Sequence, residues 1–286
     1  MLNKNKILYF SKMHGLGNDF VILDRINQEF YLSSKIVQKI SDRNTGIGFD
    51  QLLIVESAKN INYDFYYRIF NANGSEVAQC GNGARCFSYF IYLKNMTKKR
   101  NIIVKTKNSH ISIQFINKKN IIVNMGKPKF NELNIPEFVL KNFSLKTISI
   151  HDYTITYGTI FIGNPHCVII VNNINQYPIL NIGKLLNNHP LFPEGVNVNY
   201  IQVISADQII LRVYERGVGE TQACGSGACA SVIFGIIQGI LKKKVLVTLP
   251  GGNLEISWNG FGHDVYMTGP AEHVYDGYIN KKLFQF

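Results

Sequence analysis

The sequence lacks the features that mark several large classes of protein. Charged residues make up only 17% of the 286 residues, against about 25% in an average protein, and 46% of the residues are hydrophobic. This composition excludes a long disordered chain. The eight prolines and 24 glycines are ordinary numbers and exclude a collagen-like or proline-rich chain. A globular protein remains, and a chain of this length folds without disulfide bonds or a structural metal.

Long hydrophobic runs are also missing. The apolar stretch near the N-terminus, 7–10, is too short for the core of a signal peptide. The longest apolar segment, 228–241, is interrupted by polar residues and glycines, and we expect a buried helix there rather than a membrane span. The five cysteines are an odd number without the spacing of a disulfide framework. We therefore expect a reduced, cytoplasmic protein with no membrane partner.

The positive net charge of +11 raises the possibility of a nucleic-acid partner. The densest basic runs are 98–100 and 242–244, and neither reaches the five or six like charges of a basic arm. No aromatic-basic pattern of an RNA-binding sheet is present. A lysine-rich solvated surface explains the charge better, so we expect no nucleic-acid partner. A basic RNA-binding protein stays as the alternative from a different class.

Runs of β-branched and aromatic residues predict a chain rich in strands. The expected strands are 6–14, 20–24, 51–56, 63–71, 102–107, 111–116, 121–125, 147–150, 154–162, 167–171, 197–205, 209–214, 245–249 and 253–258. The expected helices are 34–43, 83–92, 182–188 and 227–241. Glycine and prolines at 126–136 predict a boundary between two halves.

An internal repeat is the most informative feature of the sequence. The segment 68–84 matches 212–228, so that Arg68, Glu76 and Cys80 recur 144 residues later as Arg212, Glu220 and Cys224. Both segments pass from a strand to the start of a helix at Cys-Gly-x-Gly-Ala. A second, weaker match pairs the segment 17–22 with the segment 163–169, and both begin with Gly-Asn. The repeat predicts two similar domains that face each other across a cleft.

Cys80 and Cys224 each precede Gly-x-Gly at an expected helix N-terminus, where unpaired N–H groups and the helix dipole favour a thiolate. The same N–H groups bind anions such as a carboxylate, because glycine lets a ligand approach the backbone closely. The other cysteines, Cys86, Cys167 and Cys229, lie within apolar elements and are expected to be inert. Two matched thiols beside carboxylate sites suggest racemisation or epimerisation, in which one thiolate removes an α-proton and the opposite thiol supplies another.

Other roles for the two cysteines fit the sequence less well. The spacing of Cys80 to Cys86 and of Cys224 to Cys229 differs from the usual zinc hooks. The glycine-rich turns lack the Lys-Ser/Thr of a phosphate-binding loop. A standing disulfide between Cys80 and Cys224 is disfavoured in a reducing compartment. No pattern of a pyridoxal phosphate enzyme is present, so we expect no cofactor and no metal.

Seven ordered motifs resemble the diaminopimelate epimerase family, and they cover nearly the whole chain. They are 12–20 (KMHGLGNDF), 46–51 (GIGFDQ), 71–86 (NANGSEVAQCGNGARC), 163–166 (GNPH), 192–197 (FPEGVN), 215–229 (ERGVGETQACGSGAC) and 269–271 (GPA). The two cysteine motifs are the most specific of the set. The resemblance implies a homodimeric epimerase that interconverts LL- and meso-2,6-diaminopimelate in lysine and cell-wall precursor biosynthesis.

The resemblance also implies roles for individual residues. Cys80 and Cys224 would be the catalytic acid and base, and His166 and Glu215 would tune their pKa. The residues that would hold the substrate are Asn18, Gln51, Asn71, Asn164, Asn197, Glu215 and Arg216, with Gly81, Asn82, Gly225 and Ser226 binding the reacting carboxylate. Tyr275 would correspond to a dimer-contact tyrosine.

Ordinary structural roles remain open for most of these residues. An asparagine beside glycine or proline is often a turn residue, His166 could be a structural histidine, and Glu215 with Arg216 could form a surface ion pair. The chain also departs from the family pattern at Asn73, Gly195 and Val218, where the family usually has Asp, Arg and Ala. The alternative enzyme is an amino-acid racemase of the proline-racemase type, which uses the same two-thiol chemistry.

Taken together, the sequence predicts an α+β protein of two similar domains related by pseudo-two-fold symmetry. Each domain is expected to be a largely antiparallel sheet or barrel around a central helix, with the active site in the cleft between the domains. The first domain should comprise 1–126, joined by the C-terminal segment 270–286, and the second should comprise 127–269.

Overall fold

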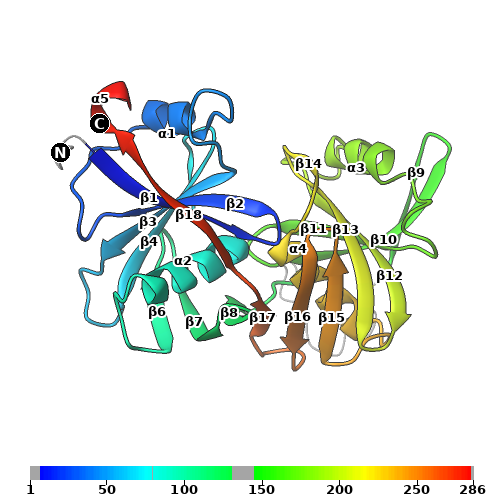
Figure 1. The fold of residues 1–286 in the computed structure, drawn as a ribbon. Coiled ribbons are helices and arrows are strands. Elements are labelled where there is room, and N and C mark those ends of the chain that lie inside the picture. The colour runs from blue at the N-terminus through cyan, green and yellow to red at the C-terminus, as the bar shows by residue number, and fades with distance from the viewer. Residues whose placement is uncertain (1–6, 79, 131–144, 285–286) are drawn as a thin grey trace. The chain divides into compact units, whose positions relative to one another are not determined.

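The computed structural model describes residues 7–78, 80–130 and 145–284 (Figure 1). The described chain divides into two compact units. Unit 1 comprises the residues up to Val123 and those from Gly269 onward, and unit 2 runs from Asn124 to Thr268. Of the boundary segment 126–136 that the sequence predicted, residues 131–136 lie outside the described residues. No helix of the described segments is long and apolar enough to cross a bilayer.

Unit 1 is a curved sheet around one helix. Its elements are β1 (Ile7–Gly15), β2 (Asn18–Asp24), α1 (Ser34–Ser41), β3 (Gln51–Ser57), β4 (Phe65–Asn71), β5 (Glu76–Val77), α2 (Gly81–Leu93), β6 (Asn101–Lys105), β7 (His110–Asn117), β8 (Asn120–Gly126), β18 (Glu272–Asn280) and α5 (Lys281–Phe284). The strands pair in the order β18-β1-β2-β3-β4-β6-β7-β8. The pairs β2–β3 and β4–β6 are parallel, and the others are antiparallel.

Unit 2 repeats this plan. Its elements are β9 (Lys146–Ile150), β10 (Tyr153–Phe161), β11 (Pro165–Ile170), α3 (Ile179–Asn187), β12 (Asn197–Ser205), β13 (Gln208–Glu215), β14 (Gly219–Thr221), α4 (Gly225–Ile237), β15 (Lys244–Leu249), β16 (Gly252–Trp258) and β17 (Val265–Gly269). The strand order is β9-β10-β11-β12-β13-β15-β16-β17. Here β11–β12 and β13–β15 are parallel, at the positions equivalent to the parallel pairs of unit 1. The predicted α+β fold of two similar halves is confirmed.

The burial pattern explains why α2 and α4 lie at the centre of their units. Helix α4 packs against β10, β11, β12, β13 and β16, and nearly all of its residues are buried. Helix α2 packs likewise against β1, β2, β3, β7 and β18. A helix that is apolar on all sides is stable only when other elements surround it. Figure 1 shows strands of the same unit around each of these two helices.

The structure differs from the sequence prediction at the start of these two helices. The expected starts were residues 83 and 227, but α2 begins at Gly81 and α4 at Gly225, so each cysteine is itself the N-cap residue. Cysteine is not a usual N-cap residue, which is why the sequence placed the helix start two residues late. The short strands β5 and β14 and the last strands β17 and β18 were also not predicted. Strand β18 pairs with β1 along nearly its whole length.

Candidate active site

The two matched cysteines occupy the N-cap positions of α2 and α4. Both have extended backbone angles, with φ of −150° at Cys80 and −119° at Cys224. The Gly83 N–H donates to Cys80 Sγ at 3.3 Å. Cys224 Sγ lies 3.6 Å from the Ser226 hydroxyl and is in hydrogen-bond reach of the Gly227 N–H. Each sulfur therefore lies against the N–H groups at a helix N-terminus.

A matched ion pair fixes the turn that leads to each cysteine. Arg68 on β4 binds both carboxylate oxygens of Glu76 on β5, each at 2.9 Å. Arg212 on β13 binds Glu220 on β14 in the same way, at 2.6 and 2.9 Å. Such two-point contacts define geometry better than a single ion pair. The Arg and Glu of the sequence repeat therefore have a structural role, because they tie the short strand before the cysteine to the sheet.

The second glycine of each Cys-Gly-x-Gly turn allows a close approach between helix and sheet. A Cβ atom on Gly83 would overlap the Tyr67 hydroxyl. A Cβ atom on Gly227 would lie 2.5 Å from Asn199 Oδ1 and 3.3 Å from Cys224 Sγ. Any larger residue would push the helix start away from the strands beneath it.

Four predicted substrate residues of unit 1 form two hydrogen-bonded pairs. Gln51 and Asn71 lie opposite each other on β3 and β4, and Gln51 Nε2 donates to Asn71 Oδ1 at 2.8 Å. Asn82 Nδ2 lies 3.4 Å from Asn18 Oδ1. The structure thus gathers side-chain amides near the start of α2. An amide offers an oxygen that can accept from an ammonium group and an NH₂ group that can donate to a carboxylate.

An ionic cluster that the sequence analysis missed supports these amides. Arg43 binds Asp19 at 2.8 and 3.0 Å and Asp50 at 2.9 Å, while Lys12 binds Asp19 at 2.6 Å. Burial alone would raise the pKa of Asp19, but the hydrogen bonds from Arg43 and Lys12 hold it well below its ordinary value. Asp50 in turn accepts a hydrogen bond from Asn18 Nδ2 at 2.9 Å. The sequence did contain a signal for this cluster, because Asp19 and Asp50 are direct neighbours of the predicted site residues Asn18 and Gln51.

In unit 2, parallel strands β11 and β12 bring together three predicted site residues. His166 pairs in register with Asn197, and its Nε2 lies 2.8 Å from Asn164 Oδ1. Asn197 Oδ1 accepts the backbone N–H of Arg216 at 2.9 Å. His166 is buried, and burial lowers its pKa to about 3. The imidazole is therefore neutral at physiological pH.

The environment of Cys224 differs from the sequence expectation that the helix end favours a thiolate. The residue is only 4% exposed, and burial, followed by the nearby Glu215 carboxylate, raises the pKa of the Cys224 thiol well above its usual value. The hydrogen bonds from Ser226 and Gly227 lower this pKa, but by less. Glu215 is held by the Thr221 hydroxyl at 2.5 Å. This raised pKa favours the protonated thiol of Cys224 at neutral pH.

Arg216 is exposed, and its Nη1 donates to the Glu194 carbonyl at 3.0 Å. The adjacent Gly195, one of the departures from the family pattern, has a φ of +76°, and a Cβ atom there would lie 2.9 Å from Arg216 Cδ. Glycine at 195 therefore makes room for the stem of Arg216. A second departure, Asn73, still accepts from the Ser75 N–H at 3.0 Å, as an aspartate would. Val218, the third, is exposed.

All five cysteines lie among the described residues, and all are thiols. Cys86, Cys167 and Cys229 are fully buried, and burial raises the pKa of the Cys86 and Cys167 thiols. These three cysteines belong to the core. Within the described segments, no group of His, Cys, Asp or Glu side chains has the arrangement of a metal site.

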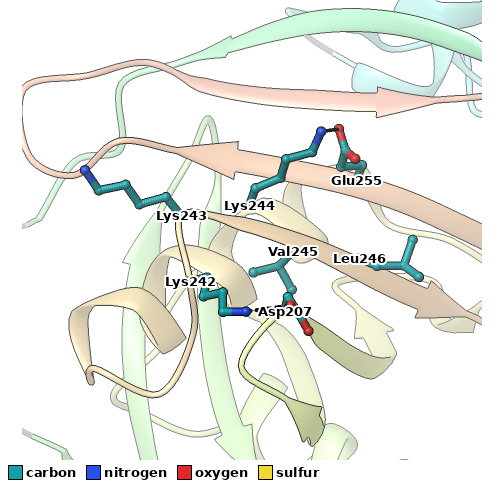
Figure 2. A pocket seen from close by; sticks show the side chains of 7 residues that line it. All are labelled: Asp207, Lys242, Lys243, Lys244, Val245, Leu246 and Glu255. Carbon is teal, nitrogen blue, oxygen red and sulfur yellow. Dashed lines mark hydrogen bonds and ion pairs between the residues drawn. The ribbon is translucent and has the colours of Figure 1, made fainter.

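The basic run 242–244 lies at a surface hollow of about 490 Å³ that contains none of the predicted site residues. Figure 2 shows Lys242 paired with Asp207 and Lys244 paired with Glu255, at 2.8 and 2.9 Å. These exposed ion pairs have the character of a solvated surface.

The solved structures similar to this chain share its fold. A hydroxyproline epimerase from Agrobacterium vitis aligns with a TM-score of 0.72 at 13% identity, covering 98% of this chain and 94% of its own. A probable proline racemase from Agrobacterium radiobacter aligns with a TM-score of 0.67 at 12% identity, covering 94% and 92%. A phenazine biosynthesis protein of the PhzF family from Bacillus anthracis aligns at 0.69 and 16% identity, covering 96% and 99%. The chain therefore shares the fold of a class of proteins that includes an epimerase, a probable racemase and a phenazine biosynthesis protein.

The sequence comparisons narrow this class to one family. Residues 10–131 and 158–274 match the diaminopimelate epimerase family. A diaminopimelate epimerase from Buchnera aphidicola subsp. Baizongia pistaciae is 54% identical over 281 residues, which is 98% of both chains. The chain belongs to the diaminopimelate epimerase family, as its motifs predicted.

Proposed function

We propose that this diaminopimelate epimerase interconverts the LL and meso forms of its substrate by proton transfer to and from Cys80 and Cys224, without a cofactor. The single observation that supports this mechanism most strongly is the matched position of the two thiols. Each is the N-cap of the central helix of its unit, and each turn is fixed by the same Arg–Glu pair.

The chemistry requires both thiols to act on one carbon atom. A thiolate takes the α-proton, so that the C–H bond breaks, an S–H bond forms, and the electron pair moves into the carboxylate as an enediolate. The second thiol then gives its proton to the opposite face of the carbon and becomes a thiolate. The N–H groups at Gly81, Asn82, Gly225 and Ser226 would bind the reacting carboxylate and stabilise the charge that develops on it.

The surroundings of the thiols suggest which one starts as the acid. Cys224 is buried beside the Glu215 carboxylate, and both effects favour the protonated thiol. The acid of the reaction must be protonated before the substrate binds. Cys80 is more exposed and accepts the Gly83 N–H, a hydrogen bond that a thiolate accepts more strongly than a thiol does. We therefore assign Cys80 as the base and Cys224 as the acid of the resting enzyme. In the reverse direction the two exchange roles. Glu215 would tune Cys224 directly, and His166 would act through Asn164.

The remaining predicted residues suit the distal amino-acid group of the substrate. Arg216 offers a planar guanidinium for a carboxylate, and the side-chain amides offer donors and acceptors. The proposed substrate-binding residues are Asn18, Gln51, Asn71, Asn164, Asn197, Glu215 and Arg216.

We also propose that the enzyme is a cytoplasmic homodimer. On β18, Val274, Tyr275 and Tyr278 are about half exposed, as is Tyr9 on the paired strand β1. Tyr278 packs on Tyr9, and Tyr275 packs on Phe10, which points to the other side of β1. Exposed aromatic residues are typical of protein interfaces. A second copy of the chain would cover the strand at Tyr275. Five thiols in a biosynthetic enzyme favour a reducing compartment.

The test is an assay of purified enzyme after dialysis against a chelator, with no added cofactor. We expect LL-diaminopimelate to be converted to the meso form and L-proline to remain unchanged. Activity that is lost on dialysis and returns with zinc would contradict the cofactor-free mechanism. Racemisation of proline would support the proline-racemase alternative. Light scattering in solution tests the dimer, with Tyr275→Asp as the variant expected to dissociate.

A further inference from the structure

Asn199 is a buried polar residue of unit 2 that the sequence analysis did not single out. It lies on β12 two residues after Asn197, and its side chain is 0% exposed. A buried amide is costly unless its groups are hydrogen-bonded. The contacts of Asn199 therefore indicate what it does.

Two backbone carbonyls determine how the Asn199 amide is turned. Its Nδ2 lies 3.0 Å from the Cys167 carbonyl and 3.4 Å from the Asn197 carbonyl. If the amide were reversed, its oxygen would face two other oxygens without a proton between them. The NH₂ group must therefore point toward these carbonyls, which settles an orientation that otherwise has to be assigned.

This orientation determines the position of the proton on His166. Asn199 Nδ2 is also 3.1 Å from His166 Nδ1. The NH₂ group has two protons, and its two shortest contacts are with the Cys167 carbonyl and His166 Nδ1, while the Asn197 carbonyl is farther away at 3.4 Å. His166 Nδ1 therefore accepts, since an amide NH₂ group only donates. In the neutral imidazole the proton is then on Nε2, which donates to Asn164 Oδ1 at 2.8 Å. Because Asn164 Oδ1 is occupied in this way, the NH₂ group of Asn164 is the part left to donate to a ligand.

We propose that Asn199 is a positioning residue that holds His166 in its Nε2–H tautomer and thereby keeps the Asn164 amide oriented to donate to the substrate. The proposal deepens the proposed function and rests on it for the role of Asn164. Asn199 also lies beside the Cys224 turn, since its Oδ1 and Cys224 Sγ are both close to the position of a Cβ on Gly227. One side chain thus links the histidine to the start of the catalytic helix.

In unit 1, the positions that correspond to His166 and Asn199 hold apolar residues. In the parallel pair β2–β3, Phe20 pairs with Gln51 as His166 pairs with Asn197, so Leu53 corresponds to Asn199. Phe20 and Leu53 both lie 3.3 Å from the position of a Cβ on Gly83. Leucine therefore fits this place in the fold, and Asn199→Leu removes the hydrogen bonds while keeping a shape that the sheet accepts.

The decisive measurement is the tautomer of His166, read by NMR in the intact enzyme labelled with ¹⁵N-histidine, without substrate. We expect the proton on Nε2 and a hydrogen-bonded, unprotonated Nδ1. A proton on Nδ1 would overturn the proposal. This measurement needs no substitution at Asn199, so it tests the assignment even if a variant fails to fold. A His166→Gln sample identifies the signal.

Kinetics of two variants test the consequence. In Asn199→Leu the Nδ1 signal should lose its hydrogen-bond shift, and KM for diaminopimelate should rise about tenfold with a smaller change in kcat, as expected when one hydrogen bond to a charged group is lost. Asn199→Asp should move a proton to His166 Nδ1. Gln202→Leu is the control, because Gln202 lies on the same strand and accepts the Ile174 N–H away from His166. Unchanged His166 signals and an unchanged KM in Asn199→Leu would reject the proposal.

The outcomes separate this proposal from the proposed function. If Cys224→Ala retains epimerisation, the two-thiol mechanism fails, whatever the tautomer of His166. If Cys224→Ala is inactive but His166 carries its proton on Nδ1, only the role of Asn199 fails.

Discussion

Cys80 and Cys224 occupy equivalent positions in two copies of one fold, but their surroundings differ. Around Cys80 the helix start packs on Phe20, Leu53 and the Tyr67 hydroxyl, and the thiol is partly exposed. Around Cys224 the equivalent strand positions hold His166 and Asn199, Glu215 lies nearby, and the thiol is almost fully buried. The helix caps and the Arg–Glu pairs place the two sulfurs alike. The neighbouring side chains differ, and those around Cys224 raise the pKa of its thiol.

This difference suits a reaction that needs one base and one acid at the same time. A perfectly symmetric site would hold both thiols in the same state before the substrate arrived. At Cys224, burial and a neighbouring carboxylate raise the pKa of the thiol without a change in the fold.

The largest effect should come from removing either catalytic thiol. Cys80→Ala and Cys224→Ala should each lower kcat for epimerisation by about a thousandfold or more, since each removes a general acid–base group. Cys86→Ala, Cys167→Ala and Cys229→Ala, at buried core thiols, are the matched controls and should retain most of the activity. Substantial turnover in either of the first two variants would contradict the assignment.

Alkylation rates should show the difference between the two thiols directly. In the unliganded enzyme at neutral pH, iodoacetamide should label Cys80 at least about tenfold faster than Cys224, because Cys224 is buried and protonated. Glu215→Gln removes the carboxylate that raises the pKa of Cys224, so the ratio should fall. Peptide mapping by mass spectrometry gives both rates. Equal labelling in the parent enzyme would remove the basis for assigning Cys224 as the acid.

Arg216 has no counterpart in unit 1, where Ala72 lies at the equivalent place in the repeat. If Arg216 binds the distal carboxylate, Arg216→Lys should raise KM about tenfold and change kcat less, because lysine keeps the charge but loses the two-point geometry. Steady-state kinetics and a binding titration measure this. A variant that binds the substrate as well as the parent would leave Arg216 a surface residue.

The last expected effect is on stability at low pH rather than on activity. The pKa of His166 is about 3 in the folded protein, against an ordinary value of 6.5 for histidine, so the unfolded chain binds more protons between these values. The free energy of unfolding should therefore decrease as pH falls from about 6.5 toward 3, by up to about 1.4 kcal/mol per pH unit from this group. His166→Phe, which copies Phe20, should flatten this slope. His110→Phe, at an exposed histidine, is the control, and an equal slope in parent and His166→Phe would contradict the burial argument.

The sequence predicted most of the fold because local patterns determine it. Strands such as 197–205 were recognisable from their β-branched and aromatic residues, and the repeat predicted two similar units. Strand β18 was missed because none of its residues is buried and its sequence, EHVYDGYIN, does not alternate regularly between apolar and polar residues. The helix starts were placed late because a cysteine cap is not a standard signal.

The site was less predictable because its properties depend on contacts between distant segments. The resemblance indicated which residues to consider, including Glu215, but not that burial raises the pKa of the Cys224 thiol more than the Glu215 carboxylate does. In the sequence, nothing distinguishes Asn199 from the other residues of the expected strand 197–205. Its function appears only when β11 and β12 pair and bring it next to His166.

The central claim is that two different thiols exchange protons with one carbon atom. It is tested most directly by epimerising LL-diaminopimelate in deuterated water and analysing product and recovered substrate at low conversion. A two-base enzyme should give meso product with one deuterium at the inverted carbon, while the recovered substrate keeps its hydrogen. Product that retains the original hydrogen would show that a single group removes and returns the proton, and would contradict the account.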